Sequence, residues 1–412
     1  MKVILLILLS IKCCESLALP LRLHKVRKAD TPIEILEDVV SDEELNEMLD
    51  TTLTESSVRS LMVDYKLTRY GLLARFRGTI LESTWHAVAA NMLVALILVV
   101  LFRTFGVDFE HGGYLWNLWE PPLPESFKFY QQLMALDNAW HYIMTLSTFT
   151  LTFFLNEAYG CYVNVIKLGR KMQGRLNDFG MILAHRAKRN NSGEIDPDAM
   201  KFLQNIARNV RVFSLLHYSG QSRRHAILKT TRGINALVKR GALTEEEGSS
   251  ILSCPSSPSQ RHWIILQWMF LQCQEALNKG LLVGDRSALE QLFDARAHEL
   301  RGASASFSDE LDDGPPLAYA HFVQLLVDVF VILCPLALYP EMGAFCVPVS
   351  GLLTLFYQGL LNLAKFFLDP LDNNNCTGLK GDTIQWDTMI AESNSGSLRW
   401  IKAASAKLPW KK

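Results

Sequence analysis

The stretch STFTLTFFLNEAYG, residues 147–160, combines side chains that rarely occur together in one helix. It is apolar enough for a membrane, but its polar groups include four hydroxyls, an amide and a carboxylate (Ser147, Thr148, Thr150, Thr152, Asn156 and Glu157). Phe149 and Phe153 are one helical turn apart, so they share a face of a helix. That spacing is consistent with ordinary packing as well as with a specialised face.

A second side chain that could have a chemical role is Asp328, in the middle of the apolar run LLVDVFV. A charge within a membrane is costly unless it is paired, so such a carboxylate is a functional candidate; a neutral or paired carboxylate in a protein interface is the alternative. His141 and His321 lie near the ends of apolar runs, where packing explains them. The sequence contains no Walker A loop, GxGxxG, HExxH or GxSxG motif. We therefore expect neither an enzyme nor a bound cofactor.

Composition narrows the class of protein further. The chain has 412 residues, of which 49% are apolar and 20% charged, and its formal net charge is -1. This balance does not indicate a nucleic-acid partner. The eight cysteines are scattered without a CxxC pair, so neither a zinc site nor a disulfide framework is predicted.

Four long apolar stretches predict an all-α membrane protein. Since about 20 helical residues cross a bilayer, each stretch is long enough to span it. The expected spans are about 84–105, 138–166, 317–338 and 344–368. Residues 167–316 show apolar positions spaced three to four apart and predict a soluble helical part.

The distribution of basic residues orients these spans. Basic side chains precede the first span and follow the second, whereas residues 106–125 between those two spans include acids and no Lys or Arg. The third and fourth spans are joined by only five residues, 339–343. Both termini and the long middle part are therefore predicted on the basic side, the cytosol or the stroma of a plastid.

The N-terminus carries targeting signals. Residues 1–18 have the short basic start, apolar core and small-residue exit of a signal peptide. Residues 19–60 begin basic and become acidic, which is similar to a plastid transit segment followed by a mobile acidic linker with one short helix at most. An ordinary secretory signal is the alternative. Residues 396–412 are expected to form a C-terminal tail.

Several short motifs, in order, resemble the bestrophin anion channels, and the stretch STFTLTFFLNEAYG is more similar to their plant and algal plastid branch than to the animal one. These are YGLLARFRGTI at 70–80 before the first span, Pro-Leu-Ala-Tyr at 316–319, and Leu-Asp-Pro-Leu at 368–371 after the fourth. The resemblance covers about residues 65–395. It implies a homopentamer around a central pore lined by the second span.

The resemblance places the pore neck at Thr145, Phe149 and Phe153. Thr145 departs from the apolar residue of animal members, which makes the neck wetter. Edges of aromatic rings carry partial positive charge and would favour weakly hydrated anions, and nearby hydroxyls would replace part of the anion's hydration shell. The basic residues that follow would form a positive pore entrance (Lys167, Arg170, Lys171 and Arg175).

The implied function is passive flux of chloride, bicarbonate or both across a plastid membrane, most plausibly the thylakoid, in ion regulation of photosynthesis or carbon supply. Plasma membrane or endomembrane is the alternative location. The alternative function is a non-conducting scaffold that recruits partners through its basic helical part. Animal members bind calcium through acids after the fourth span; here Asp369 and Asp372 remain among asparagines. We expect weak or absent calcium dependence, because calcium sites use several carboxylates.

Overall fold

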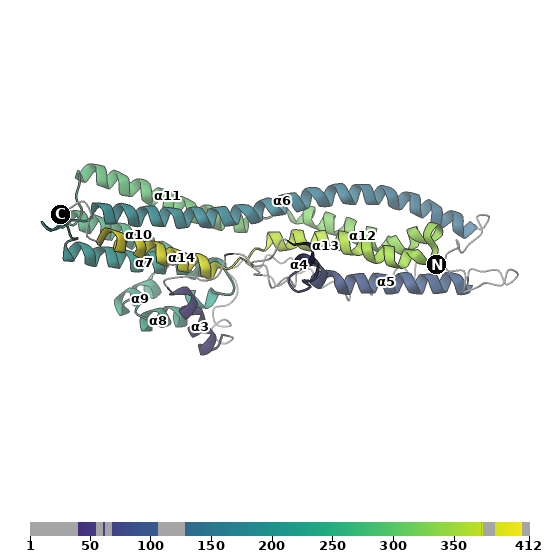
Figure 1. Ribbon diagram of the computed structural model, residues 1–412, viewed down its shortest axis with the longest axis horizontal. Coiled ribbons are helices and arrows are strands. Elements are labelled where there is room, and N and C mark those ends of the chain that lie inside the picture. The colour runs from purple at the N-terminus through teal and green to yellow at the C-terminus, as the bar shows by residue number, and fades with distance from the viewer. Residues whose placement is uncertain are drawn as a thin grey trace. The chain divides into compact units, whose positions relative to one another are not determined.

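The computed structural model describes residues 40–54, 61, 68–105, 128–371, 373 and 384–405. Within that part the regular structure is helical, which confirms the all-α expectation, and the bridges are isolated pairs. The expected signal peptide 1–18 lies outside the described residues, as do most of 19–60 and the end of the tail. The chain forms two compact units, and the long helix α6 (Lys128–Arg186) contributes to both (Figure 1).

The first unit comprises the apolar helices. Its elements are α4 (Arg69–Leu73), α5 (Ile80–Phe105), α6 as far as Tyr162, α12 (Leu317–Met342), the 3-10 turn η4 (Gly343–Phe345) and α13 (Cys346–Leu368). Among the described residues, Ile80–Phe102 and Leu317–Leu368 are long and apolar enough to cross a membrane, and the second stretch contains both α12 and α13. The expected span 138–166 lies inside α6, where its hydroxyls and carboxylate lower the hydropathy.

Helix α13 packs closely on α5 because glycines replace side chains at the contact. A Cβ atom at Gly351 would lie 2.6 Å from the Met92 sulfur. At Gly359 a Cβ atom would lie 2.5 Å from Cγ2 of Ile80. Such distances are far below van der Waals contact, so both glycines set how near the two backbones come. The same use of small residues is common between membrane helices.

A buried polar link joins α5, α12 and α13. Pro335 lies inside α12 and has no backbone N–H, so the carbonyl of Val331 lacks its usual helical partner. The side-chain amide of Asn91 donates to that carbonyl at 3.3 Å and to the hydroxyl of Thr354 at 2.7 Å. Asn91 and Thr354 are both buried. The Asn91 side chain thus supplies the hydrogen-bond donor that the Val331 carbonyl lacks because of Pro335.

We expect Asn91→Leu to lower the free energy of unfolding by about 1–3 kcal/mol, because it leaves the Val331 carbonyl without this donor in an apolar surrounding. Thermal unfolding of the purified protein in detergent would measure the change. His86→Leu, which removes an exposed polar side chain from the same helix, serves as the control and should change stability little. Equal effects of the two substitutions would contradict this role for Asn91.

The second unit is built from the remaining helices. Besides α6 after Tyr162, it contains α3 (Asp42–Thr52), α7 (Pro197–Gln221), η2 (Ala226–Lys229), α8 (Thr231–Lys239), α9 (Glu245–Ser253), η3 (Pro258–Gln260), α10 (His262–Asn278), α11 (Arg286–Asp312) and α14 (Trp386–Ser405). Helix α6 continues to Arg186 without a break, so the expected boundary at residue 166 does not coincide with the end of a helix.

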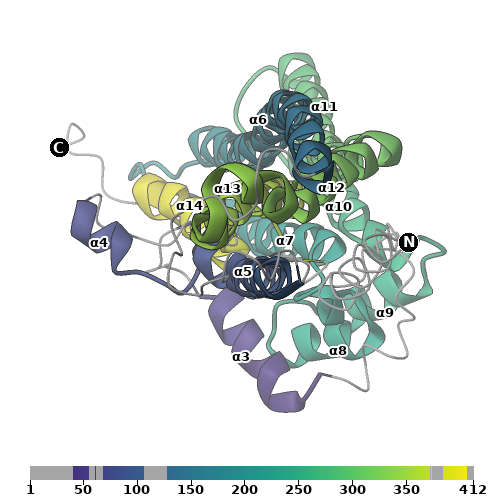
Figure 2. The same cartoon turned by 90° about the vertical axis from the view of Figure 1, so that its right-hand side faces the viewer.

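The acidic segment before the first span contains one short helix, α3, as the sequence allowed, and this helix packs against other helices of the second unit. The helix begins with a capping box between Ser41 and Glu44, and it buries Leu45 and Leu49. Figure 2 shows it beside α8, whose Arg232 binds Asp42 at 2.5 Å. The acidic side chains of this segment suggested that it is solvated, but Asp42 forms an ion pair with Arg232 of α8.

Two buried histidines lie in an aromatic cluster of the second unit. The rings of His217 in α7 and His262 in α10 are 5.0 Å apart between centroids. The Ser304 hydroxyl is 2.9 Å from Nδ1 of His217. Burial lowers the pKa of His262 to about 4. Burial, together with the neighbouring His262 ring, also holds the pKa of His217 well below its ordinary value. Both imidazoles are therefore neutral at neutral pH.

We expect the second unit to lose stability as the pH falls from about 6.5 to about 4. In this window the unfolded chain binds a proton at His262 that the folded chain does not, so unfolding becomes more favourable. The pKa difference at His262 corresponds to about 3 kcal/mol once the pH is below both values. Urea unfolding between pH 7 and pH 4 would measure this loss.

His262→Phe should reduce this pH dependence, because the phenyl ring keeps the packing and does not titrate. His298→Gln changes an exposed histidine and is the matched control. A pH profile of His262→Phe that is identical to that of the unchanged protein would refute the assignment.

Candidate functional site

Helix α6 has two distinct faces in the first unit. One face is buried at intervals of three, four or seven residues and packs with α12 and α13 (Trp140, Ser147, Leu151, Phe154, Ala158 and Tyr162). Trp140 anchors it: its indole N–H donates to the carbonyl of Phe330 at 3.0 Å, and its ring stacks on that of Phe330 with centroids 4.7 Å apart. The opposite face of α6 carries exposed side chains, among them Thr145, Phe149 and Phe153.

Two large aromatic side chains stand on this exposed face. Phe149 is 64% exposed and Phe153 is 57% exposed. Their ring centroids are 4.7 Å apart and the rings are inclined by 57°. Thr145, one turn before Phe149, is exposed as well. The structure therefore places the three predicted neck residues on one side of one helix, away from the core of the unit.

The hydroxyls of this segment are directed toward the helix backbone. Thr145 donates to the carbonyl of His141 at 3.1 Å and Thr152 to that of Thr148 at 2.7 Å. Thr148 donates to the carbonyl of Met144 at 2.8 Å, so at 2.6 Å from Tyr357 its oxygen accepts the phenol proton. These three hydroxyl hydrogens are engaged, so the expected role for them in replacing an anion's hydration shell is not supported in this conformation.

The phenylalanine ring edges remain as partial positive charges on the face. An aromatic ring is negative on its faces and positive at its edge, so an anion is attracted to the edge. Apolar walls also exclude strongly hydrated cations, which lose their water shell only at high cost. The two ring edges place partial positive charge on this face of α6 without a cationic side chain at Thr145, Phe149 or Phe153.

The predicted entrance residues differ in their surroundings within the second unit. Lys167 and Lys171 are exposed. Arg170 binds the carboxylate of Glu392 in α14 and donates to Gln173 at 2.9 Å. Arg175 lies 3.5 Å from Asp178 and 3.2 Å from Glu299 of α11. Two of the four predicted positive charges are therefore balanced by carboxylates.

Sequence reasoning missed these acidic partners. Glu392 is 222 residues away from Arg170 in the chain, and no local pattern connects them. Glu299 likewise belongs to a different helix from Arg175. Only Asp178, three residues after Arg175, was visible as a neighbour on the same helix face.

Asp328 is part of a hydrogen-bonded chain in the first unit. Gln324, one turn earlier in α12, donates from its amide to Oδ2 of Asp328 at 2.7 Å. Lys365 of α13 donates to Oε1 of Gln324 at 2.6 Å. The carboxylate is thus linked through an amide to a lysine, which is the paired arrangement that the sequence left open. Gln324 was detectable from its spacing of four residues.

The expected calcium candidates are only partly described. Asp369 follows the last residue of α13, and its Oδ1 accepts from the backbone N–H of Asn373 at 2.9 Å. Asp372 lies outside the described residues. Among the residues that the structure describes, no three His, Cys, Asp or Glu side chains gather in a group suited to a metal ion.

Comparison with known proteins identifies the relatives of this chain. A family model described as Bestrophin, RFP-TM, chloride channel, matches residues 60–375. No curated protein matches the sequence. A bacterial bestrophin homologue from Klebsiella pneumoniae has a TM-score of 0.55 and 18% identity, covering 76% of this chain and 97% of the homologue.

Two further solved structures agree with this likeness. A variant of the Klebsiella pneumoniae homologue has a TM-score of 0.54 and 18% identity, covering 77% of this chain and 99% of its own. A variant described as a membrane protein has a TM-score of 0.56 and 18% identity, covering 77% of this chain and 97% of its own. At this identity the likeness to solved structures concerns the fold.

We expect micromolar calcium to leave activity and stability unchanged, because the two carboxylates Asp369 and Asp372 among several asparagines offer too little charge for tight binding. Calorimetric titration of the chelator-treated protein with calcium would test this. Asp369→Asn should behave like the unchanged protein in the same titration. A saturable heat at micromolar calcium that disappears in Asp369→Asn would contradict the prediction.

Proposed function

Because the chain belongs to the bestrophin family, whose members are integral membrane proteins known as anion channels and not enzymes, we propose that it is a passive anion channel. Chloride and bicarbonate are the proposed permeant ions. The observation that carries the proposal is the exposure of Phe149 and Phe153 on the side of α6 opposite its packed face. Two adjacent exposed phenylalanines on one helix face can contact lipid, another copy of the chain or a pore lumen, and the proposal assigns them to the lumen.

The proposed assembly is a homopentamer in which α6 of each copy faces a central pore. Its four proposed spans are α5, the first part of α6, α12 and α13. Thr145, Phe149 and Phe153 would then form successive rings at the neck. Thr145 adds a polar atom at one end of the neck, which makes that level easier to wet than the two aromatic levels.

Electrostatics of the proposed entrance rest mainly on two lysines. Lys167 and Lys171 are exposed, whereas Arg170 and Arg175 bind carboxylates and contribute less net field. A modest positive potential raises the local anion concentration without holding an anion tightly. That property suits a channel, because a permeant ion has to leave the entrance as readily as it arrives.

The proposed location is a plastid membrane, the thylakoid in particular, as in the plant and algal branch of the family. This rests on the signal-like and basic N-terminal sequence and on the resemblance of the α6 segment to that branch. Subcellular fractionation of the source cells with an antibody against the second unit would test it. Recovery in the plasma membrane or endomembrane fraction would refute the plastid assignment and leave the channel proposal intact.

Reconstitution of the full-length protein in planar bilayers tests the proposed activity. Reversal potentials in asymmetric potassium chloride should show anion selectivity, and replacement of chloride by bicarbonate should report their relative permeability. A well-folded pentamer that carries no current under these conditions would instead favour the non-conducting scaffold.

Phe149→Ala should change the chloride-to-potassium permeability ratio about two- to tenfold, since removal of an aromatic contact is worth about 0.5–1.5 kcal/mol. The measurement is the shift of the reversal potential in the same bilayers. Leu96→Ala is the matched control, because Leu96 is an exposed apolar residue of α5. An unchanged ratio in Phe149→Ala would remove this residue from the neck.

A further inference from the structure

His141 continues the row of the proposed neck residues on α6. It precedes Thr145 by four residues, and Phe149 and Phe153 follow at the same interval, so the four side chains belong to one inclined row of the helix surface. The position of this histidine near the end of an apolar run favoured packing, but its side chain is 53% exposed. The row therefore begins, one turn before Thr145, with a side chain that can carry a positive charge.

The neighbours of His141 along α6 set its direction. Trp140 is buried against Phe330, and its ring lies edge-on to the imidazole with centroids 5.5 Å apart. Adjacent residues are separated by about 100° around a helix, so a buried Trp140 turns His141 toward the exposed side. The backbone carbonyl of His141 accepts the hydroxyl of Thr145 at 3.1 Å. The imidazole is thus placed next to the first level of the proposed neck.

A backbone carbonyl holds one of the two ring nitrogens of His141. Its Nδ1 lies 3.0 Å from the carbonyl oxygen of Asp137, one turn earlier in α6. A carbonyl only accepts, so this contact is a hydrogen bond when Nδ1 carries the proton. The neutral imidazole then presents the lone pair of Nε2 to a ligand, whereas the protonated imidazole presents an N–H donor there. Protonation thus changes Nε2 from an atom that repels an anion to one that attracts it.

The charged neighbours at this end of α6 are carboxylates. Oδ1 of Asp137 lies 3.5 Å from Nδ1 of His141, and the Asp137 side chain is only 4% exposed. Glu341 at the end of α12 is exposed, and its charge acts on Asp137. Both carboxylates can titrate, so a test of His141 needs variants of each.

We propose that His141 is a selectivity-determining residue of the channel, at a fourth level of the neck, and that its protonated imidazole favours anions. This inference rests on the proposed function and adds a group that the aromatic neck does not require. In the proposed pentamer, five imidazoles would surround the pore on the side of the membrane opposite the predicted basic side. Imidazoles change charge between about pH 5 and pH 8. Anion selectivity should therefore rise as the solution becomes acidic.

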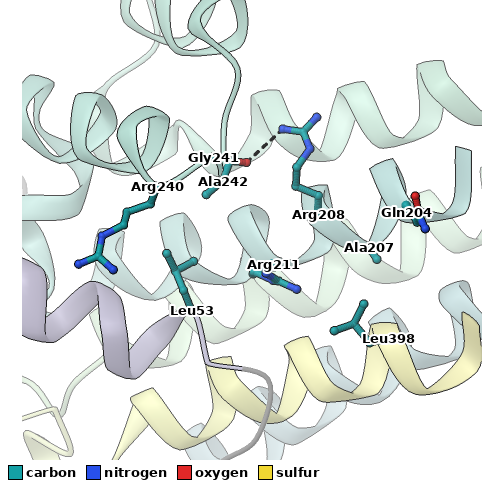
Figure 3. A pocket seen from close by; sticks show the side chains of 9 residues that line it. All are labelled: Leu53, Gln204, Ala207, Arg208, Arg211, Arg240, Gly241, Ala242 and Leu398. Carbon is teal, nitrogen blue, oxygen red and sulfur yellow. Dashed lines mark hydrogen bonds between the residues drawn. The ribbon is translucent and has the colours of Figure 1, made fainter. Parts of the chain in front are cut away.

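A cavity of about 420 Å³ in the second unit is a weaker candidate for a binding site (Figure 3). Arg208 and Arg240 are among its lining residues. Glu247 binds Arg208 and Asp50 binds Arg240, so both guanidinium groups already have anionic partners. The cavity therefore gives no evidence for a ligand of a particular charge.

Reversal potentials of the full-length protein in planar bilayers at pH 8 and pH 5.5 test the proposal. The solutions contain asymmetric potassium chloride and have the same pH on both sides, so the orientation of the protein does not matter. The chloride-to-potassium permeability ratio should rise about three- to tenfold at the lower pH, which is the effect expected of a unit charge close to an anion in water. Low ionic strength should enlarge the rise, because the charge is then less screened.

Two substitutions of His141 should act in opposite ways. His141→Gln keeps a polar side chain without the charge, so its permeability ratio should stay low at both pH values. His141→Lys is charged at both, so its ratio should be high at both. Asp137→Asn and Glu341→Gln should keep the rise. His321→Gln changes an exposed histidine of α12 and is the matched control, which should also keep it.

The possible results separate the role of His141 from the channel itself. Anion-selective current with the same permeability ratio at both pH values would overturn the role of His141 and leave the proposed function standing. The same conclusion would follow if His141→Gln kept the rise while Asp137→Asn or Glu341→Gln lost it. A well-folded protein without anion-selective current would overturn both proposals. Thermal unfolding in detergent would show that each variant is folded.

Discussion

A carbonyl group that loses its helical partner in an apolar surrounding must find another donor, and in the first unit Asn91 supplies it. Pro335 has no backbone N–H, so the Val331 carbonyl lacks its usual donor within α12. The side-chain amide of Asn91 donates to this carbonyl. The same amide also donates to the hydroxyl of Thr354, which connects α13 to the contact. The glycines of α13 then allow the close approach to α5 that this short bond requires. The apolar helices are held together by a few polar atoms as well as by packing.

The two faces of α6 depend on that assembly. Trp140 and the residues spaced along its buried face occupy the space that α12 and α13 provide, so the orientation of α6 about its own axis is set from within the unit. Once this face is occupied, Phe149 and Phe153 have to point away from it. Thr148 and Thr152 donate their hydroxyl hydrogens to backbone carbonyls of the same helix, so these polar side chains can lie on an apolar face with their hydrogen-bond donors satisfied.

In the second unit, charged side chains act mainly as connections between distant segments. Glu392 of α14 binds Arg170 of α6, Asp42 of α3 binds Arg232 of α8, and Glu247 binds Arg208. The basic sequence after the second apolar stretch is therefore less positive in the folded chain than a count of its residues suggests.

The sequence by itself determined the helical class, the apolar runs that became α5, α12 and α13, and the pairing of Phe149 with Phe153 on one face, because helical periodicity and hydropathy are local properties. The family followed from short motifs in order. Only the tertiary structure decided which face of α6 is buried, that α3 is docked, and that Arg170 and Asp328 have partners. These outcomes depend on contacts between segments far apart in the chain, whose distance and orientation no local pattern encodes.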